Sequence, residues 1–342
     1  MRCPVCGGDC IRDAPAVLES LSSVFSKCEE CRFRILDKNA PLRGRFYATP
    51  CACNRRFIDE VFAHIYVIFL DEGILSGDEP LRAVGSPLIH PGFFMTSPPF
   101  LSPDSLVLLS PIVTEEAAKR IVVEVPEVKG VVKCGDYVPG VTDLSLSSPY
   151  RTYQLLAGCD VRAGVFSTRA GPLVIYTQQS VMHIEFPRLR NPKIQSVERH
   201  LGTRHPTWCV DACSGAGTLG LCAARHGVLG VIMSDAWYAA AYWSAVNLHV
   251  NRMFFKIDEI VFHSTYDAMQ EHMVRRDPVR IADAGGDQSI LVYQGDYREL
   301  WRVLPSEPVC AVLDIFHKSD KDETDRILQE WQSRVPGEVF IP

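Results

Sequence analysis

A short glycine-rich stretch, WCVDACSGAGTLG from Trp208 to Gly220, constrains this chain more than any other feature. It begins with apolar residues suited to a buried strand, places an acid at Asp211, and then spaces Gly215, Gly217 and Gly220 as G-x-G-x-x-G. The residues LGLCAAR that follow favour a helix. The pattern therefore predicts a strand, a tight turn and a helix whose free N–H groups face the turn, where a polar or anionic ligand group binds.

A second apolar run, VLGVIMSD, ends in another acid, Asp235. An acid at the end of the second strand binds the ribose hydroxyls of a nucleoside cofactor, whichever cofactor that is. Two alternative interpretations of this pattern remain. One is a structural turn that binds no ligand, and the other is a nicotinamide or flavin site. Nicotinamide-type loops usually run from the strand directly into the first glycine, whereas here Asp211 lies at the strand end, four residues before Gly215.

The sequence D-A-C-S-G-A-G-T-L-G resembles motif I of class I S-adenosylmethionine (SAM) methyltransferases. The stretch AVNLHVNR, with Asn247 and Asn251, is similar to the helix after the second strand in RNA-modifying methyltransferases, especially the archaeal–eukaryotic tRNA-guanine and wybutosine-pathway group. The resemblance covers about 140 of the 342 residues and implies a Rossmann-like domain that uses SAM. The cofactor-binding residues that it implies are Asp211, Cys213 (where many members have a glycine), Gly215, Gly217, Asp235 for the ribose and Asp296 for the adenine.

The resemblance also places Asp314, after the strand VCAVL, where motif IV faces the target atom. Asp314 and His317 are therefore the candidate catalytic residues, and a histidine has a pKa suited to a general base near neutral pH. The residues at this position, DIFH, are not the Asn/Asp-Pro-Pro-Tyr signature of base amino methylation, and no cysteine follows a proline-rich motif IV. Three functions stay open: an RNA methyltransferase, a methyltransferase of a protein side chain or cofactor precursor, and a non-catalytic SAM-fold subunit.

Residues 201–342 alternate strands with helices, which predicts an α/β domain with a parallel sheet and helices on both faces. We expect five strands in the order 3-2-1-4-5, an insertion at residues 254–289, and none of the two further strands usual in the family. Strand five, at residues 338–342, would then form an open edge. Because it is apolar, we expect it to be covered by strands of residues 120–185 or by a second subunit.

Residues 1–58 hold seven of the 13 cysteines, including two C-x-x-C pairs about 20 residues apart. This spacing predicts a zinc-ribbon-like module in which Cys3, Cys6, Cys28 and Cys31 bind one ion. The other three cysteines, Cys10, Cys51 and Cys53, leave room for different pairs, and an iron–sulfur cluster or no metal remain alternatives. In a chain without a secretory signal, we interpret the cysteines as metal ligands and reduced thiols, and the protein as cytoplasmic.

The cysteine-rich module has a net charge of +4, against −10 for the rest of the chain. A basic module, and basic residues 186–207 ahead of the glycine loop, are consistent with an RNA partner, and equally with a charged, solvated surface. A protein substrate or a partner subunit is also open. No apolar run approaches the length of a membrane span, so we expect no membrane partner.

Residues 59–200 predict an α+β domain that positions the substrate. We expect a helix at 58–75, a helix capped by Thr114, a hairpin around residues 169–171, and irregular structure at the proline-rich residues 76–111. The isolated histidines of this region, including His183, are interpreted as structural.

Overall fold

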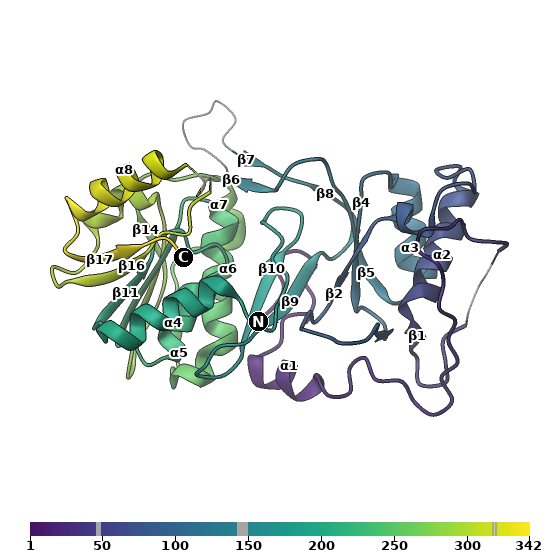
Figure 1. Cartoon of the computed structure of the whole chain (residues 1–342), viewed down its shortest axis with the longest axis horizontal. Helices are drawn as coiled ribbons and strands as arrows, with labels where there is room; N and C mark the ends of the chain where they lie inside the picture. Colours follow the sequence, from purple (N-terminus) through teal and green to yellow (C-terminus); the bar gives the residue numbers. More distant parts are fainter. Residues whose placement is uncertain (46–48, 142–149, 317, 319) are drawn as a thin grey trace.

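The computed structural model describes residues 1–45, 49–141, 150–316, 318 and 320–342. The molecule is elongated, with a seven-stranded sheet and its helices at one end and a four-stranded sheet with two helices at the other (Figure 1). The hairpin of strands β9 and β10 lies between them (Figure 1). None of the helices in the described ranges is long and apolar enough to cross a membrane.

Five parallel strands make up most of the C-terminal sheet, and they have the predicted order 3-2-1-4-5. Strand β11 is central, and the glycine loop follows it directly. Parallel strands bring their carboxyl ends to one edge, so the residues after each strand meet there. Across the sheet, the strands are β15 (Ser289–Gln294), β12 (Gly230–Asp235), β11 (Trp208–Asp211), β16 (Val309–Val312) and β17 (Gly337–Phe340).

The segment expected to be an insertion completes this sheet. It supplies β14 (Val279–Ala284) and β13 (Ile260–Phe262), which continue the sheet beyond β15 as antiparallel strands. The expectation of a short, five-stranded sheet was therefore wrong, because the additional strands come before strand three in the chain and not after strand five.

The expected cover of β17 was also wrong as far as strands are concerned. Within the described residues β17 pairs only with β16, and the strands of residues 120–185 pair elsewhere. Side chains of α4 (Pro192–Arg204), the helix before β11, cover one face of this end instead: the rings of His200 and Phe340 stack with centroids 3.7 Å apart, and Arg204 pairs with Glu338 at 3.1 Å. The apolar residue Val339 points to the other face, where it is buried in one cluster with Ile327 and Trp331 and needs no further strand.

Helices cover both faces of the sheet, as predicted. Successive strand residues point to opposite faces, so Cys209 packs in one apolar cluster and Val210 in another. The first face carries α4 (Pro192–Arg204), α5 (Thr218–Arg225) and α6 (Tyr238–Asn251), and the second carries the 3₁₀ helix η3 (Tyr297–Arg302) and α8 (Lys321–Gln332).

The middle region has the predicted α+β character. Its four-stranded sheet packs against two helices, and Thr114 caps the second by accepting a hydrogen bond from the Ala117 N–H at 3.3 Å. The proline-rich residues 76–111 were expected to be irregular, but three strands form there because neighbouring strands satisfy their backbone groups. The elements are α2 (Ile58–Asp71), β2 (Ser86–Ile89), β3 (Phe100–Leu101), β4 (Leu106–Ser110), α3 (Glu115–Glu124), β5 (Val128–Lys133) and β8 (Gln154–Gly158).

The predicted hairpin is present as β9 (Val161–Phe166) and β10 (Leu173–Gln178), with Gly171 at φ 118° in its turn. Its apolar residues share a cluster with the helices of the C-terminal sheet, and so does α1 (Ala14–Ser20). The apolar clusters therefore do not divide at residues 58 and 200, where we expected domain boundaries.

The described residues between 21 and 55 contain no helix or strand, so the strands of a zinc ribbon are absent there.

Part of the charge of the N-terminal module is neutralised by the rest of the chain: Arg56 is buried against Glu127 with an N–O distance of 2.6 Å, and Arg45 pairs with Asp71 at 2.9 Å. The remaining short elements are β1 (Arg56–Phe57), η1 (Leu81–Val84), β6 (Gly140–Val141), β7 (Tyr150–Arg151), η2 (Arg252–Phe255) and α7 (Tyr266–Gln270).

Candidate functional site

The glycine loop has the predicted form of strand, turn and helix. Gly215 and Gly217 have φ values of 52° and 83°, which residues with a Cβ rarely adopt. No hydrogen bond within the described residues uses the N–H groups of Thr218 and Leu219, the first two residues of α5, and both residues line a cavity. These free donors, at the positive end of the helix dipole, suit a carboxylate or another anionic ligand group.

Gly220 is required for a different reason. A Cβ at this position would lie 2.5 Å from Met233 Cγ and 3.2 Å from Asp211 Cβ. The third glycine of the motif therefore lets α5 approach the central strands closely, while the first two shape the turn.

Asp211 is fully buried below this loop. Its Oδ2 accepts a hydrogen bond from the Gly220 N–H at 2.8 Å, and its Oδ1 has no partner among the described residues. Burial raises the pKa of Asp211 to about 8, against the opposing effect of the Gly220 hydrogen bond. Because it does not line the cavity, Asp211 holds the loop and is not placed to touch a ligand directly.

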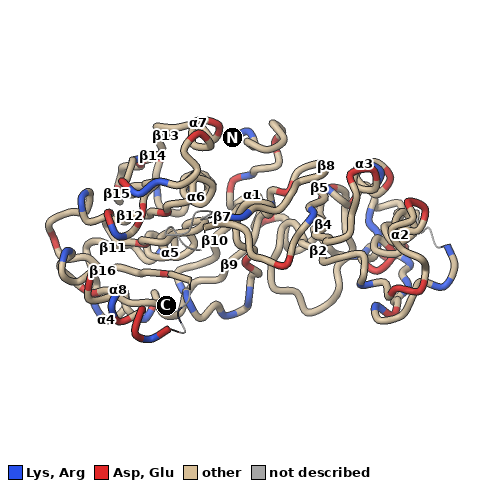
Figure 2. The backbone as a smooth tube through the Cα atoms, turned by 90° about the horizontal axis from the view of Figure 1, so that it is seen from above, with Lys and Arg blue, Asp and Glu red and all other residues tan. Residues whose placement is uncertain are grey.

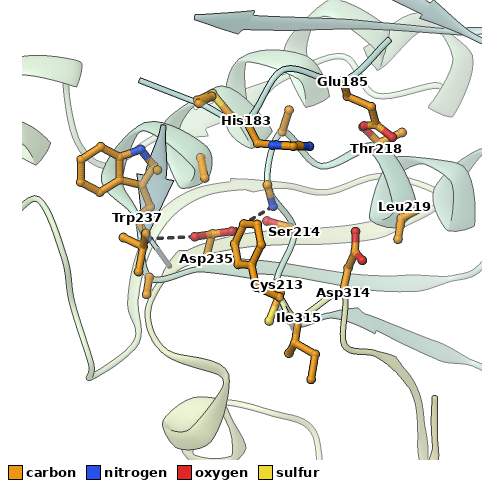
Figure 3. A pocket seen from close by; sticks show the side chains of 18 of the residues that line it. His183, Glu185, Cys213, Ser214, Thr218, Leu219, Asp235, Trp237, Asp314 and Ile315 are labelled. Atoms are coloured by element: carbon orange, nitrogen blue, oxygen red, sulfur yellow. Dashed lines mark hydrogen bonds between the residues drawn. The ribbon is translucent and has the colours of Figure 1, made fainter. Parts of the chain in front are cut away.

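Asp235 lies at the end of β12 and lines the cavity, as predicted for a ribose-binding acid. Its Oδ2 accepts from the Gly215 N–H and its Oδ1 from the Trp237 N–H, both at 2.9 Å (Figure 3). Burial raises the pKa of Asp235 to about 6. Each carboxylate oxygen keeps a second lone pair, so the side chain can still accept hydrogen bonds from hydroxyl groups.

Asp296 caps η3 and also lines the cavity. It accepts hydrogen bonds from the Arg298 backbone and guanidinium, both at 3.0 Å. Next to these acids, Cys213 lines the cavity as well, and burial raises the pKa of its thiol well above the ordinary value. Cys213 is therefore a neutral contact group at neutral pH and not a thiolate.

Asp314 follows β16 and points into the same cavity (Figure 3). Its carboxylate pairs with two ammonium groups, Lys193 of α4 at 2.7 Å and Lys318. Burial lowers the pKa of Lys193, but the charge and hydrogen bond of Asp314 outweigh this effect, so the pKa is raised overall. His317, the other candidate catalytic residue, lies outside the described residues.

The cavity has a volume of about 560 Å³, within the range of sites for small molecules and cofactors. Residues after four of the parallel strands form one wall, and residues of the β9–β10 hairpin and of the segment that follows it form another. Figure 3 shows His183 and Glu185 across the cavity from Cys213 and Asp314.

Sequence reasoning missed the hairpin side of this cavity. His183, interpreted as structural, lines it and has an edge-to-face ring contact with Phe316 at 6.4 Å. Partial burial lowers the pKa of His183, so the imidazole is neutral near neutral pH. Trp237 and Tyr297 also line the cavity. Their position one or two residues after predicted acids was the only sequence signal for them.

The four cysteines expected to bind one zinc ion do not come together. Cys3 and Cys6 lie with Cys10 and Cys159, whereas Cys28 and Cys31 lie with Cys51 and Cys53. The prediction of a single site was wrong because residues 3–10 pack against the turn between β8 and β9, far along the chain. Cys159 was missed since it has no neighbouring cysteine in the sequence. None of these eight cysteines lines the cavity.

No known family model matches the chain, and no curated protein is similar to it in sequence. Among solved structures, the chain is similar to the complex of aTrm5 with tRNALeu (13% identity, 80% of this chain, TM-score 0.39). It is also similar to Trm1 of Pyrococcus horikoshii with SAM (18%, 48%, 0.31) and to TYW2 of P. horikoshii with MeSAdo (15%, 82%, 0.39). The chain spans 62%, 38% and 78% of these three proteins, in that order.

Proposed function

We propose that this chain is a SAM-dependent methyltransferase that acts on RNA. The observation that carries the proposal is the convergence of Asp235, Asp296 and Asp314 on one cavity beside the glycine loop, each from the carboxyl end of a different parallel strand. A bare structural turn does not need buried carboxylates around an open space. A nicotinamide site does not explain Asp211, which uses one oxygen to hold the N–H of the third glycine.

The residues of the cavity suit the parts of SAM one by one. The free N–H groups of Thr218 and Leu219 would bind the methionine carboxylate, and Asp235 would accept from the ribose hydroxyls. Asp296 would accept from the adenine amino group, with Tyr297 beside it. When bound, SAM supplies an electrophilic methyl group, and the protein's part is mainly alignment and exclusion of water.

The acceptor side of the cavity would be the part where His183 and Glu185 face Asp314 from the opposite wall. Lys193 and Lys318 hold Asp314 in place, and His183 is neutral, so a carboxylate and an imidazole are the two candidate proton acceptors for the methylated group. His317 remains a further candidate from the sequence.

An RNA substrate is supported by the basic segment ahead of α4. Arg188 and Arg190 are exposed just after the cavity-lining residues His183 and Glu185, so their charges are placed to contact phosphates near the acceptor wall. Figure 2 shows acidic and basic segments interspersed along both ends of the molecule, so such contacts would be local. The acidic remainder of the chain favours a protein or cofactor-precursor substrate as the second candidate. The hypothesis of a non-catalytic subunit was based on a short sheet, and the sheet has seven strands, so this hypothesis is no longer favoured.

Zinc is the second cofactor in this proposal, with a structural role, because both cysteine clusters lie outside the cavity.

Calorimetry tests the SAM site. A hydrogen bond to a charged group contributes about 1.5–3 kcal/mol, so Asp235→Asn should weaken SAM binding about tenfold or more. Asp283→Asn is the matched control, since Asp283 lies in β14 outside the cavity and pairs with His263. No binding by the wild type, or tight binding of NADH instead, would refute the SAM site.

Labelled SAM tests the acceptor. The purified protein, incubated separately with total RNA and with total protein extract, should transfer label to RNA. Label in protein alone would establish the second candidate, and label in neither, with SAM still bound, would favour a different acceptor.

A further inference from the structure

We propose that the chain holds two zinc ions in two separate tetrathiolate sites, and that one of them fastens the N-terminus to the hairpin that walls the cavity. The first site is Cys3, Cys6, Cys10 and Cys159, and the second is Cys28, Cys31, Cys51 and Cys53.

The sulfur positions fit one metal ion in each cluster. Within each cluster all four sulfurs lie within 4.8 Å of one another. In the first, Cys3 and Cys10 are each 3.9 Å from Cys159, and in the second, Cys28 and Cys51 are 3.5 Å apart. A tetrahedral ion with Zn–S bonds near 2.3 Å requires sulfurs about 3.8 Å apart. A four-iron cluster places each thiolate on a different iron and needs a wider set, and disulfide bonding needs sulfurs about 2 Å apart.

The backbone of the first site has the shape of a metal-binding knuckle. In the C-P-V-C-G-G stretch, the Gly7 N–H donates to the Cys3 carbonyl and the Cys3 N–H donates to the Gly8 carbonyl, both at 2.9 Å. Gly7 has φ 69°, which allows this tight return of the chain. The loop thus presents Cys3 and Cys6 from one turn, as two thiolates on one ion require.

The fourth ligand of the first site is built into a rigid turn. The Cys159 N–H donates to the Lys129 carbonyl at 2.7 Å, and the Lys129 ammonium donates to the Val161 carbonyl at 2.7 Å. Lys129 is 7% exposed, and no carboxylate among the described residues pairs with it. Four thiolates and one Zn²⁺ carry a net charge of −2, so the site would supply the counter-charge that this buried ammonium lacks.

The second site joins two loops that, as far as the structure describes them, contain no helix or strand. The Asn54 N–H donates to the Cys51 carbonyl at 2.7 Å, and Arg55 reaches back to the Ser26 carbonyl at 3.0 Å, beside Cys28. Of the described residues between 21 and 55, Cys31 alone is buried, and it packs on Phe57 and Phe100. Other apolar contacts of this segment, through Phe25, Leu36 and Leu42, are only partly buried. A structural zinc ion contributes on the order of 10 kcal/mol toward offsetting the entropy of ordering such loops.

Loss of the metal ion should therefore have different structural consequences at the two sites. Cys159 lies two residues before β9, and Arg162, Gly164 and Phe166 of that strand line the cavity. A backbone contact near the first site adds to the fastening, since the Arg12 N–H donates to the Tyr176 hydroxyl of β10 at 3.0 Å. Loss of the first ion should loosen the hairpin, and loss of the second should loosen only residues 21–55.

Metal analysis of the full-length protein, purified without chelators from medium containing zinc and iron, tests the number of sites. We expect two zinc ions per chain in the wild type, one in Cys159→Ser, one in Cys53→Ser and two in Cys134→Ser, whose thiol belongs to neither cluster. One zinc per chain in the wild type, or iron in its place, would overturn the proposal.

Two further measurements are needed. One identifies the zinc ligands in the wild type, and so does not depend on the folding of a variant, and the other distinguishes the roles of the two zinc sites. X-ray absorption at the zinc edge of the wild type should show four sulfurs at about 2.3 Å and no nitrogen or oxygen ligand. Hydrogen exchange should show lost protection at residues 161–178 in Cys159→Ser but not in Cys53→Ser. Equal protection in both variants would refute the fastening role. Neither measurement uses SAM, so their outcome is independent of the methyltransferase proposal.

Discussion

Asn247 of α6 binds both backbone groups of Tyr176 in β10: its Oδ1 accepts from the Tyr176 N–H at 2.7 Å and its Nδ2 donates to the Tyr176 carbonyl at 2.9 Å. One turn later, Asn251 makes the same pair of contacts with Val174, at 3.0 and 2.7 Å. Two amides thus replace a neighbouring strand along the open edge of the hairpin. They explain how a hairpin from the middle of the sequence becomes a wall of the C-terminal cavity.

Replacing Asn247 with leucine should leave two buried backbone groups without partners. Each such group costs about 1–3 kcal/mol, so we expect Asn247→Leu to lower the free energy of unfolding by about 2–4 kcal/mol in urea. Asn39→Leu, at an exposed position, is the control and should change it by less than about 0.5 kcal/mol. Equal stability of the two variants would mean that the amides do not hold the hairpin.

Gly220→Ala tests the close approach of α5 to the central strands. The new Cβ meets Met233 at 2.5 Å, and overpacking of this kind costs about 1–3 kcal/mol. Gly202→Ala is a matched control in α4, where a Cβ meets nothing within 4 Å and alanine should stabilise the helix by about 0.4–1 kcal/mol. Thermal unfolding should therefore shift in opposite directions for the two variants, and shifts in the same direction would contradict the packing argument.

The part of the site that the sequence predicted is the part encoded locally. The glycine loop, Asp235 and Asp296 follow apolar runs that can only be central strands, and parallel order brings such strand ends together. His183 and Cys159 were not predicted because their roles depend on contacts far along the chain. A lone histidine and a lone cysteine carry no periodicity, so only the placement of the β9–β10 hairpin reveals them.

The prediction of five strands was wrong for a related reason. β13 and β14 lie in a segment without clear alternation, and they become strands by pairing outward from β15. Pairing with a preformed edge is a tertiary effect, which local propensity does not report.

Asp211 should make the stability of the ligand-free protein depend on pH. A carboxyl whose pKa is raised in the folded state stabilises that state below the unfolded pKa of about 3.9, and this stabilisation is lost as pH rises through the folded pKa, about 8 here. The stability of the wild type relative to Asp211→Asn should therefore fall between pH 5 and 8.5, by at least about 1 kcal/mol. The difference between the two proteins removes the contribution of the cysteines, which both share. Parallel curves in urea unfolding would show that Asp211 is ionised throughout.

The exposed arginines ahead of α4 should govern the salt dependence of RNA binding. Losing Arg188 and Arg190 together should weaken RNA binding and lower the slope of log K against log salt by about 0.7 for each phosphate contact on a single strand. The control is Lys119→Ala with Lys133→Ala, which removes the same charge from the middle region. Filter binding at several salt concentrations checks this, and an unchanged slope in the arginine variant would place the RNA on another surface.

Asp314 should act in the transfer step and not in SAM binding. It faces His183 across the cavity, and its two lysine partners hold it in position without using all of its acceptor sites. A general base contributes about 10²–10⁴ to the rate, so Asp314→Asn should lower kcat about 100-fold or more while the Kd for SAM changes less than about threefold. His183→Gln, measured in parallel, should lower kcat less than about tenfold if Asp314 is the base, and Asp283→Asn should leave both constants unchanged. A large loss in His183→Gln with little loss in Asp314→Asn would assign the base to the histidine and leave Asp314 as the group that positions Lys193.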